Sequence, residues 1–396
     1  MRRTLGFIFA VVLLLMLLHL LASLLNIAFL RPWSAAAPDE GPAVYKVTGA
    51  THIHTRHSDG SGTLADILTA ARANGLDFVW ISDHNTLALI DSTDGRGRPL
   101  VLVGAELSLR PGHLLEYGLS EWTSEQAMGG LSGILDRLEQ RHGLALIAHP
   151  FHPKIRWRDS VDARIQGMEI LNADVEWRND APLELLGTLF AYPFFRHAMN
   201  ALIDVPRREL RMWDSLTVQR PFVGLASVDA HAKIKLSKTS YWKFPPYDRV
   251  FTLIQNVLYL RAPLASEPDR ARSQILEALR RGRLAFGFSG LGDLRMANLW
   301  LQSGSQAYLP GETVQAASFD SLRIQLRLPA QHAFETYLYL DGVRIASSRQ
   351  ASITWPIREP GVYRVAVFQR RIRPTRLSRV NIPWLFANPF SIRKTS

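Results

Sequence analysis

The hydrophobic pattern of the chain changes near residue 296. Between 47 and about 290, apolar runs of strand length alternate with stretches in which apolar residues recur at helical spacing. Such alternation predicts an α/β fold built on parallel strands. After 296, short runs of alternating apolar and polar residues are separated by turn residues such as Asp341-Gly342, which predicts a small antiparallel β-sandwich.

One helix and the strands that follow it are well marked. Residues 63–75 carry apolar side chains at helical spacing, with Thr63 as the expected N-cap and Gly75 as the stop signal. Buried strands are predicted over 77–84, 99–109 and 144–150, because each is a continuous apolar run of strand length.

The N-terminal segment is the most hydrophobic part of the chain. Residues 5–30 contain no Asp, Glu, Lys or Arg, and Arg2 and Arg3 precede them. A helix of that length would cross a bilayer, and the arginines would keep its start in the cytoplasm. This predicts a single-pass membrane anchor, with the rest of the chain periplasmic or extracellular. A cleaved signal peptide ending near Ala35–Ala37 is the alternative.

Composition indicates the domain boundaries and excludes some kinds of chemistry and some partners. The predicted parts are the anchor (1–31), a Pro/Ala-rich linker (32–46), the α/β domain (47–292) and the β-sandwich (293–396). There is no cysteine, so thiolate nucleophiles, disulfides and sulfur-bound metals are excluded. The formal charge of +11 favours small anionic partners, while a protein that faces away from the cytoplasm is a poor partner for nucleic acid.

Residues able to bind metal ions stand where the predicted strands end. His52 and His54 end the first strand, and their i, i+2 spacing points both rings to one side. The carboxyl ends of parallel strands meet at one edge of the sheet, so such residues should converge. The full set is His52, His54, Asp59, His84, Glu106, His113, His149, Asp229 and His231. These are more ligands than one ion needs, which favours two or three ions.

The motifs resemble a known superfamily. Six motifs occur in the order found in PHP (polymerase and histidinol phosphatase) proteins. They are HIHTRHSDG (52–60), GLDFVWISDHN, GAE, GHLL, IAHPFHP and SVDAH. The resemblance covers about 49–290. It implies a distorted (β/α)7 barrel, metal ligation by the nine residues above, and two or three divalent ions, either zinc, manganese or iron. The following β-domain is similar to that of the carbaryl hydrolase-like branch.

The resemblance implies hydrolysis of a phosphoester by a metal-bridging hydroxide, since two divalent ions bring the pKa of a shared water toward neutrality. The alternatives are hydrolysis of a carbamate, amide or ester at the same metals, and a membrane-attached binding module without catalysis. Arg56, His152 and Lys233 flank the motifs and are the candidates for binding an anionic substrate or for proton transfer. Glu169, Asn172 and Asp83 are further candidates near the site.

Overall fold

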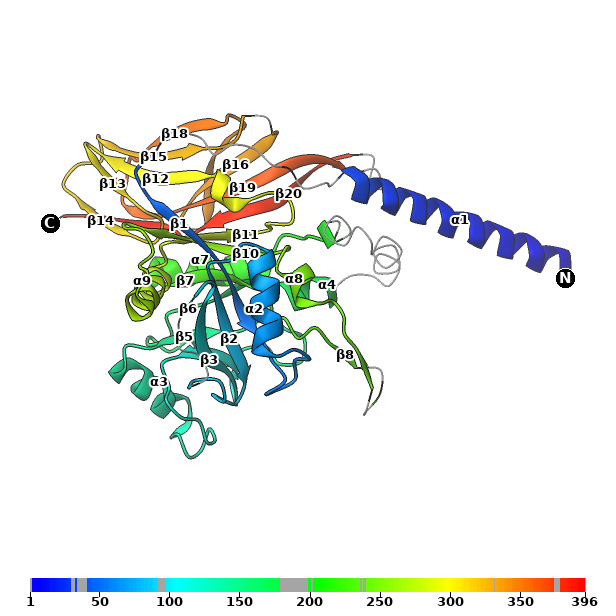
Figure 1. Ribbon diagram of the computed structural model, residues 1–396. Coiled ribbons are helices and arrows are strands. Elements are labelled where there is room, and N and C mark those ends of the chain that lie inside the picture. Colours follow the sequence, from blue (N-terminus) through cyan, green and yellow to red (C-terminus); the bar gives the residue numbers. More distant parts are fainter. Residues whose placement is uncertain are drawn as a thin grey trace.

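Seven strands of the computed structural model close into a barrel (Figure 1). In chain order they are β1 (Tyr45–Ile53), β2 (Phe78–His84), β3 (Leu100–Leu109), β4 (Gly112–Tyr117), β5 (Leu144–Ile147), β6 (Gly167–Asn172) and β7 (Val223–Ser227). The ring closes where the backbone N–H of Val228 donates to the carbonyl of Thr51 and that of His54 donates to the carbonyl of Ala230. The predicted mixed α/β fold is confirmed.

The structure describes residues 2–29, 33, 41–91, 97–178, 199–200, 202–235, 237, 240–330, 332–373 and 378–395. The apolar N-terminal run forms one helix, α1 (Arg2–Phe29), with exposed side chains such as Phe7 and Phe9. Within the described ranges, however, no helix is long and apolar enough to cross a membrane, which does not support the predicted anchor. About half of the predicted linker over 32–46 lies outside the described residues, and its last two residues, Tyr45 and Lys46, belong to β1.

The barrel differs from the predicted all-parallel arrangement at one strand. β4 runs antiparallel to both β3 and β5. The physical reason is the connection, because Arg110 and Pro111 alone join β3 to β4, whereas a parallel neighbour needs a long crossover. Gly112 begins β4 with φ +148°, and a Cβ there would lie 3.0 Å from the Cα of Trp157. The start of β4 therefore lies at the same rim as the ends of its antiparallel neighbours β3 and β5.

Helices cover the barrel from outside (Figure 1). The longer ones are α2 (Leu64–Ala73), α3 (Gly130–Gln140), α7 (Arg207–Gln219) and α9 (Pro268–Arg280), and the short ones are α4 (Ala173–Arg178), α8 (Tyr247–Val250) and the 3-10 helix η2 (Leu294–Met296). The predicted N-cap of α2 is confirmed. Thr63 accepts from the backbone N–H of Asp66, whose side chain in turn accepts from that of Thr63.

One sheet continues from the barrel into the C-terminal region. β10 (Gln255–Leu260) pairs with β1 and with β11 (Leu284–Gly287), and β11 pairs with β20 (Ser378–Ala387). A separate two-stranded hairpin, β8 (Ile234–Lys235) and β9 (Tyr241–Trp242), projects beside the barrel (Figure 1). The predicted boundary at 292/293 is therefore bridged by backbone hydrogen bonds.

The strands of the C-terminal region belong to two sheets, one separate from the barrel and the other the continuation of the barrel sheet. One contains β12 (Asn298–Ser303), β13 (Gln306–Tyr308), β15 (Leu322–Arg327) and β18 (Ser352–Pro356). The other contains β14 (Thr313–Ala316), β16 (Phe334–Leu340), β17 (Val343–Ser348), β19 (Gly361–Arg373), β20 and β21 (Phe390–Lys394). The pairing is antiparallel except between β14 and β21, which are parallel.

A buried ion pair joins the two regions. Arg364 on β19 donates from Nε and Nη2 to the carboxylate of Asp214 on α7, at 2.7 and 2.8 Å. The side chain of Arg364 is only 4% exposed, and its guanidinium lies 4.2 Å from the ring centre of Tyr339. A charge that is so enclosed needs its partner, because little water is available to replace the carboxylate.

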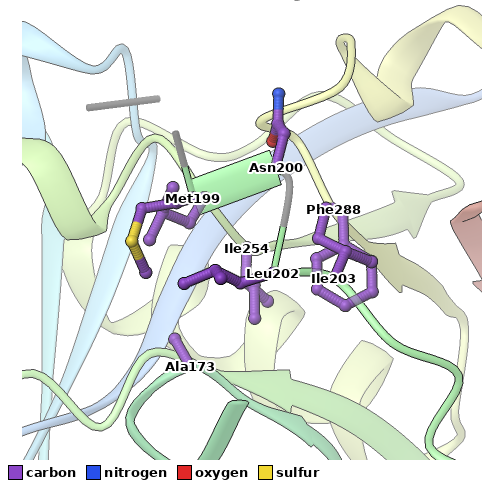
Figure 2. A pocket seen from close by; sticks show the side chains of 8 residues that line it. Ala173, Met199, Asn200, Leu202, Ile203, Ile254 and Phe288 are labelled. Carbon is purple, nitrogen blue, oxygen red and sulfur yellow. The ribbon is translucent and has the colours of Figure 1, made fainter. Parts of the chain in front are cut away.

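The core is not completely filled near the rim of the barrel. A small cavity of about 20 Å³, room for about one water molecule, is lined by Ala173, Met199, Asn200, Leu202, Ile203, Leu253, Ile254 and Phe288. Figure 2 shows Met199 and Phe288 on opposite sides of this space, with Ala173 below. We call it the apolar cavity.

Asp214→Ala should lower the free energy of unfolding by about 3 to 5 kcal/mol, because it leaves the guanidinium of Arg364 buried without a counter-charge. Urea unfolding measures this. Asp248→Ala is the matched control, since Asp248 forms only an exposed pair with Arg249, and its loss should cost less than about 1 kcal/mol. Equal losses in the two variants would contradict the proposed role of the buried pair.

Glu116 on β4 should make stability fall as pH rises. Burial raises its pKa to about 8 from 4.5, although the backbone N–H of Leu119 donates to it. Its contribution is complete below pH 4.5 and is lost as pH rises through 8, because the fold must then hold an ionised carboxylate. Glu116→Gln should remove this slope, so the stability difference between variant and parent should grow between pH 5 and pH 9 in urea titrations. A constant difference would be evidence against a buried neutral carboxyl.

Candidate metal centre

The structure brings all nine predicted ligands together at one rim of the barrel. Their ligand atoms fall into four overlapping groups, and within each group the atoms lie within 4.8 Å of one another. The groups are His54, Asp59, His84 and His231; His52, His54 and Asp229; His52, Glu106 and His149; and His84, Glu106 and His113. Because members are shared, the groups form one continuous cluster.

Strand direction explains this convergence. His84 is the last residue of β2, and Glu106 is its partner on β3. His149 and Asp229 each lie two residues beyond the ends of β5 and β7. His113 comes from the beginning of β4, which reaches this rim because β4 is reversed. The reversed strand thus contributes a histidine through its start, whereas the parallel strands contribute through their ends.

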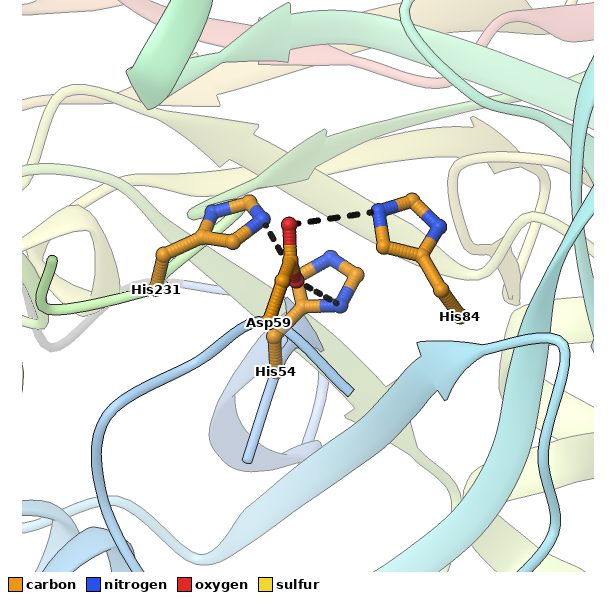
Figure 3. A group of neighbouring side chains, drawn as sticks. All are labelled: His54, Asp59, His84 and His231. Carbon is orange, nitrogen blue, oxygen red and sulfur yellow. Dashed lines mark ion pairs between the residues drawn. The ribbon is translucent and has the colours of Figure 1, made fainter. Parts of the chain in front are cut away.

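Asp59 is the centre of the outer group, as Figure 3 shows. Its carboxylate oxygens lie 3.2 Å from Nε2 of His231, 3.7 Å from Nδ1 of His54 and 3.8 Å from Nε2 of His84. Asp59 is 40% exposed, whereas His54 is fully buried. The outer group is therefore the side of the cluster that solvent and a substrate can reach.

Glu106 joins the inner groups. Its Oε1 lies 2.6 Å from Nδ1 of His113 and 2.8 Å from Nε2 of His149, and its Oε2 lies 2.9 Å from Nε2 of His52. The side chain is 1% exposed. Oε1 thus contacts one histidine from each of the two groups that contain Glu106, as expected of a carboxylate shared by two ions.

Three of these residues have a strained backbone. The φ angles are +63° at His52, +24° at His149 and +46° at Asp229. A side chain in this region costs on the order of 1 kcal/mol or more, so the surrounding structure must impose it. In each case the strain occurs at a residue whose side chain turns into the cluster.

Glu169 and Asn172 hold the inner ligands from behind. Nδ1 of His52 is hydrogen-bonded to Oε1 of Glu169 at 2.6 Å, and the backbone N–H of His149 donates to Oε2 at 2.6 Å. Asn172 donates to Glu169 at 2.9 Å and to Asp229 at 3.1 Å. With the Nδ1 proton of His52 directed at Glu169, its Nε2 is left to bind a cation. The GMEILN strand end was the sequence signal for both residues.

Other residues fix the loop that carries Asp59. Asp83 accepts from the backbone N–H and the hydroxyl of Thr55, at 2.7 and 2.6 Å, and from the hydroxyl of Ser58 at 2.5 Å. Through these bonds Asp83 holds the loop in place. The hydroxyl of Tyr247 donates to the carbonyl of His54 at 2.8 Å. No sequence signal indicated Thr55, Ser58 or Tyr247, because their partners are backbone or distant groups.

The buried carboxylates favour positive charge in the cluster. Burial lowers the pKa of His54, but the carboxylates of Asp229 and Glu106 lie 3.3 and 3.2 Å from its Nε2, outweigh the burial and raise the pKa to about 9. Burial likewise acts against ionised Glu106, yet the charge of His52 and the hydrogen-bonded histidines hold its pKa well below the usual range. His84 differs, since burial lowers its pKa to about 4.

The unsatisfied atoms test whether metal ions fit here. Among the described residues, both ring nitrogens of His54, Nδ1 of His84 and one carboxylate oxygen each of Asp59 and Asp229 are buried without a hydrogen-bond partner. Nε2 of His54 nevertheless lies 3.3 Å from Asp229 and 3.2 Å from Glu106. These atoms approach one another without hydrogen-bond geometry, as ligands of a shared cation do. Nitrogen and oxygen donors suit divalent zinc, manganese or iron, so the residues fit the predicted ions.

The three candidate catalytic residues each lie within three residues of a ligand of the cluster along the chain. Lys233 lines a cavity beside Asp229 and His231, and its ammonium lies 4.9 Å from the ring centre of Tyr241. The ring of His152 lies 5.4 Å from that of His149. Arg56 is exposed on the loop before Asp59. Their catalytic roles stay predictions.

Comparison with known proteins found distant similarities. No protein-family model matches the chain. An uncharacterized protein of Methanocaldococcus jannaschii is 28% identical over 140 residues, which are 31% of this chain and 80% of that protein. A solved two-domain protein from Bacteroides vulgatus, described as containing a predicted PHP-like metal-dependent phosphoesterase, is 13% identical and covers 89% of this chain and 99% of its own, with a TM-score of 0.42.

Two further solved structures are similar to part of the chain. A putative metal-dependent phosphoesterase from Bifidobacterium adolescentis is 16% identical and covers 54% of this chain and 96% of its own, with a TM-score of 0.28. An amidohydrolase from Chromobacterium violaceum is 12% identical and covers 50% and 92%, with a TM-score of 0.31. None of these concerns the carbaryl hydrolase-like branch. The assignment of the metal centre rests on the geometry of its own side chains.

His52→Ala and Asp229→Ala should each reduce the bound metal, because each residue belongs to at least one group of the cluster. Elemental analysis of the purified full chain measures the metal content. His57→Ala is the matched control, since this exposed histidine of the same motif is in none of the groups found among the described residues. Undiminished metal in both site variants would contradict the assignment.

Proposed function

We propose that this protein is a metal-dependent hydrolase that cleaves a phosphoester. One observation carries the proposal: Glu106 faces several histidines with both of its oxygens, within a continuous cluster of nine buried or half-buried ligands. A structural site for one ion is closed by four ligands, so this number supports a catalytic site with several ions. The order of the PHP motifs in the sequence supports the same class.

Divalent ions bound here would act as Lewis acids and would bring the pKa of a water toward neutrality. The chain's own residues determine the rest. Hydrolysis adds hydroxide to phosphorus and a proton to the departing alkoxide, so it needs an open side, a counter-charge and a proton donor. The exposed carboxylate of Asp59 marks the open side.

Lys233 is the residue best placed to meet the anion. Lys233 lines the same cavity as Asp229 and His231, and we propose that its ammonium turns from the ring of Tyr241 to stabilise the charge of a phosphoryl group. His152, next to His149, is proposed to protonate the leaving alkoxide. Arg56 is proposed to guide anionic substrates toward the loop that carries Asp59.

Hydrolysis of a carbamate, amide or carboxylic ester at the same residues is the second candidate. It is favoured by the amphipathic surroundings of the cluster, where apolar residues such as Phe244 and Leu253 lie in the same cavity as Lys233. The predicted location outside the cytoplasm stays a prediction from the sequence.

A substrate panel separates the two candidates. The full chain loaded with manganese or zinc should hydrolyse aryl phosphates and should lose this activity on dialysis against a chelator. Asp229→Ala should lower kcat/KM at least about 100-fold, because it removes one of the three metal ligands in the group of His52, His54 and Asp229. The panel includes an aryl acetate and an aryl N-methylcarbamate at equal concentrations. Turnover of either, with no phosphoester cleaved, would favour the second candidate over the first.

A further inference from the structure

We propose that the protein has a second binding site, for a small organic oxyanion, at the rim of the barrel opposite the metal centre. The site is a cleft of about 440 Å³ between the barrel and the C-terminal region, within the range of roughly 300 to 1,000 Å³ that is typical of small-molecule sites. Arg261, Arg280 and Arg281 line it, and we call it the arginine cleft. The proposal does not depend on the hydrolase function.

Strand direction places the arginine cleft away from the metal ligands. Val223, which lines the cleft, begins β7, whereas the metal ligand Asp229 follows the end of that strand. Arg261 directly follows β10, whose last residue pairs with Tyr45 at the start of β1. His52 lies near the other end of β1. The arginine cleft and the metal centre are therefore separate sites at opposite rims.

Both regions of the molecule build the arginine cleft. The barrel side contributes the C-terminal end of α9, and the C-terminal region contributes the β13–β14 and β20–β21 connections. The two sides are in direct contact at Gly311, where φ is +85° and a Cβ would lie 2.3 Å from the carbonyl oxygens of Arg281 and Gly282. The cleft is therefore a hollow in a closely packed junction.

Positive charge exceeds negative charge at the arginine cleft. A fourth arginine lies beside the three that line it, at 3.8 Å from Glu277. Among the described residues, the ion pairs of these four arginines involve two carboxylates, Glu312 and Glu277. Four cations and two anions leave an excess of two positive charges. The four are Arg261, Arg280, Arg281 and Arg283.

Arg283 shows that this excess is not compensated by the chain itself. Its Nε is buried and has no hydrogen-bond partner among the residues that the structure describes. Burial lowers the pKa of Arg283 below its usual range, and the carboxylates of Glu312 and Glu277 do not offset this effect. A guanidinium that is withdrawn from water without sufficient counter-charge favours an anion nearby.

The lining arginines also retain N–H donors for such an anion. Arg261 binds Glu312 through Nη2, at 2.6 and 2.8 Å, and Arg281 binds Glu277 through Nε. Their other guanidinium nitrogens have no hydrogen bonds to the described part of the chain. The side chains are 52% and 64% exposed, so an anion can reach them from solvent. The planar guanidinium group matches the geometry of an oxyanion.

The rest of the lining favours an organic body on the anion. Pro221, Phe222, Val223 and Val362 contribute apolar surface to the cleft, and Tyr308 contributes an aromatic ring. An inorganic ion would leave this surface in contact with water, whereas an apolar group would cover it. The arginine cleft therefore matches an oxyanion that carries an apolar group better than it matches a free inorganic ion.

Benzenesulfonate is a suitable probe, because it joins an oxyanion to an apolar ring and has no ester bond to hydrolyse. It should bind the metal-loaded full chain with a dissociation constant of about 1 mM or below, measured by calorimetry. Benzenesulfonamide is neutral and has nearly the same shape. It should bind at least about tenfold more weakly, because it forms no charge-assisted hydrogen bonds with the arginines.

Two arginine substitutions test the location. The double variant Arg280→Gln/Arg281→Gln should bind benzenesulfonate at least about tenfold more weakly, with its metal content retained. Arg349→Gln is the matched control, since Arg349 is exposed and pairs with Glu335 but does not line the cleft. It should keep the parental dissociation constant. Asp229→Ala should keep it too, because the metal centre lies at the other rim.

Each outcome bears on the arginine cleft and none depends on hydrolysis. The inference is overturned if the parent shows no saturable binding, if the sulfonamide binds equally well, or if the double variant binds like the parent. Loss of binding in Asp229→Ala would place the probe at the metal centre and would overturn it as well. If the double variant does not fold, the sulfonamide and Asp229→Ala comparisons still decide. Absence of phosphoester cleavage would contradict the proposed function alone.

Discussion

The concentration of charge at the rim of the barrel is the constraint on which the rest of the site depends. Glu106, Asp229 and Glu169 are carboxylates withdrawn from water within a few ångströms of one another. Such groups repel each other unless positive charge stands between them, and here imidazoles approach from every side. The same carboxylates raise the affinity of the site for any cation. The buried carboxylates would destabilise the rim if no positive charge were present, and the same carboxylates make the rim a site that binds cations.

Local geometry keeps the imidazoles next to these carboxylates and so offsets the repulsion between them. Backbone strain at His52, His149 and Asp229 turns their side chains inward at the points where strands end. Behind them, Glu169, Asn172 and Asp83 hold ligands and loops through hydrogen bonds that do not face the substrate side. Solvent therefore reaches the cluster at Asp59, which is 40% exposed, whereas His54 behind it is fully buried.

Much of this site was predictable from the sequence, because strand-end position is a local property. The spacing of His52 and His54, and the runs before His84 and His149, were sufficient to predict convergence. The reversal of β4 was missed, since apolar periodicity carries no direction and only the short Arg110-Pro111 connection indicates it. The roles of Thr55, Ser58 and Tyr247 also could not be predicted, because their hydrogen bonds join residues far apart in sequence or involve the backbone. For the N-terminal run, hydrophobicity predicted both a helix and a membrane anchor; the helix is present, whereas no described helix is long and apolar enough to cross a membrane.

The pairing of β11 with β20 has a consequence for biosynthesis. About ninety residues separate the two strands, so a ribosome completes the barrel sequence long before β20 emerges. During that interval β11 offers an unpaired edge, and its neighbour β10 is already in place to form a template for other chains. A nascent chain in this state is exposed to misassembly until β20 emerges and pairs with β11.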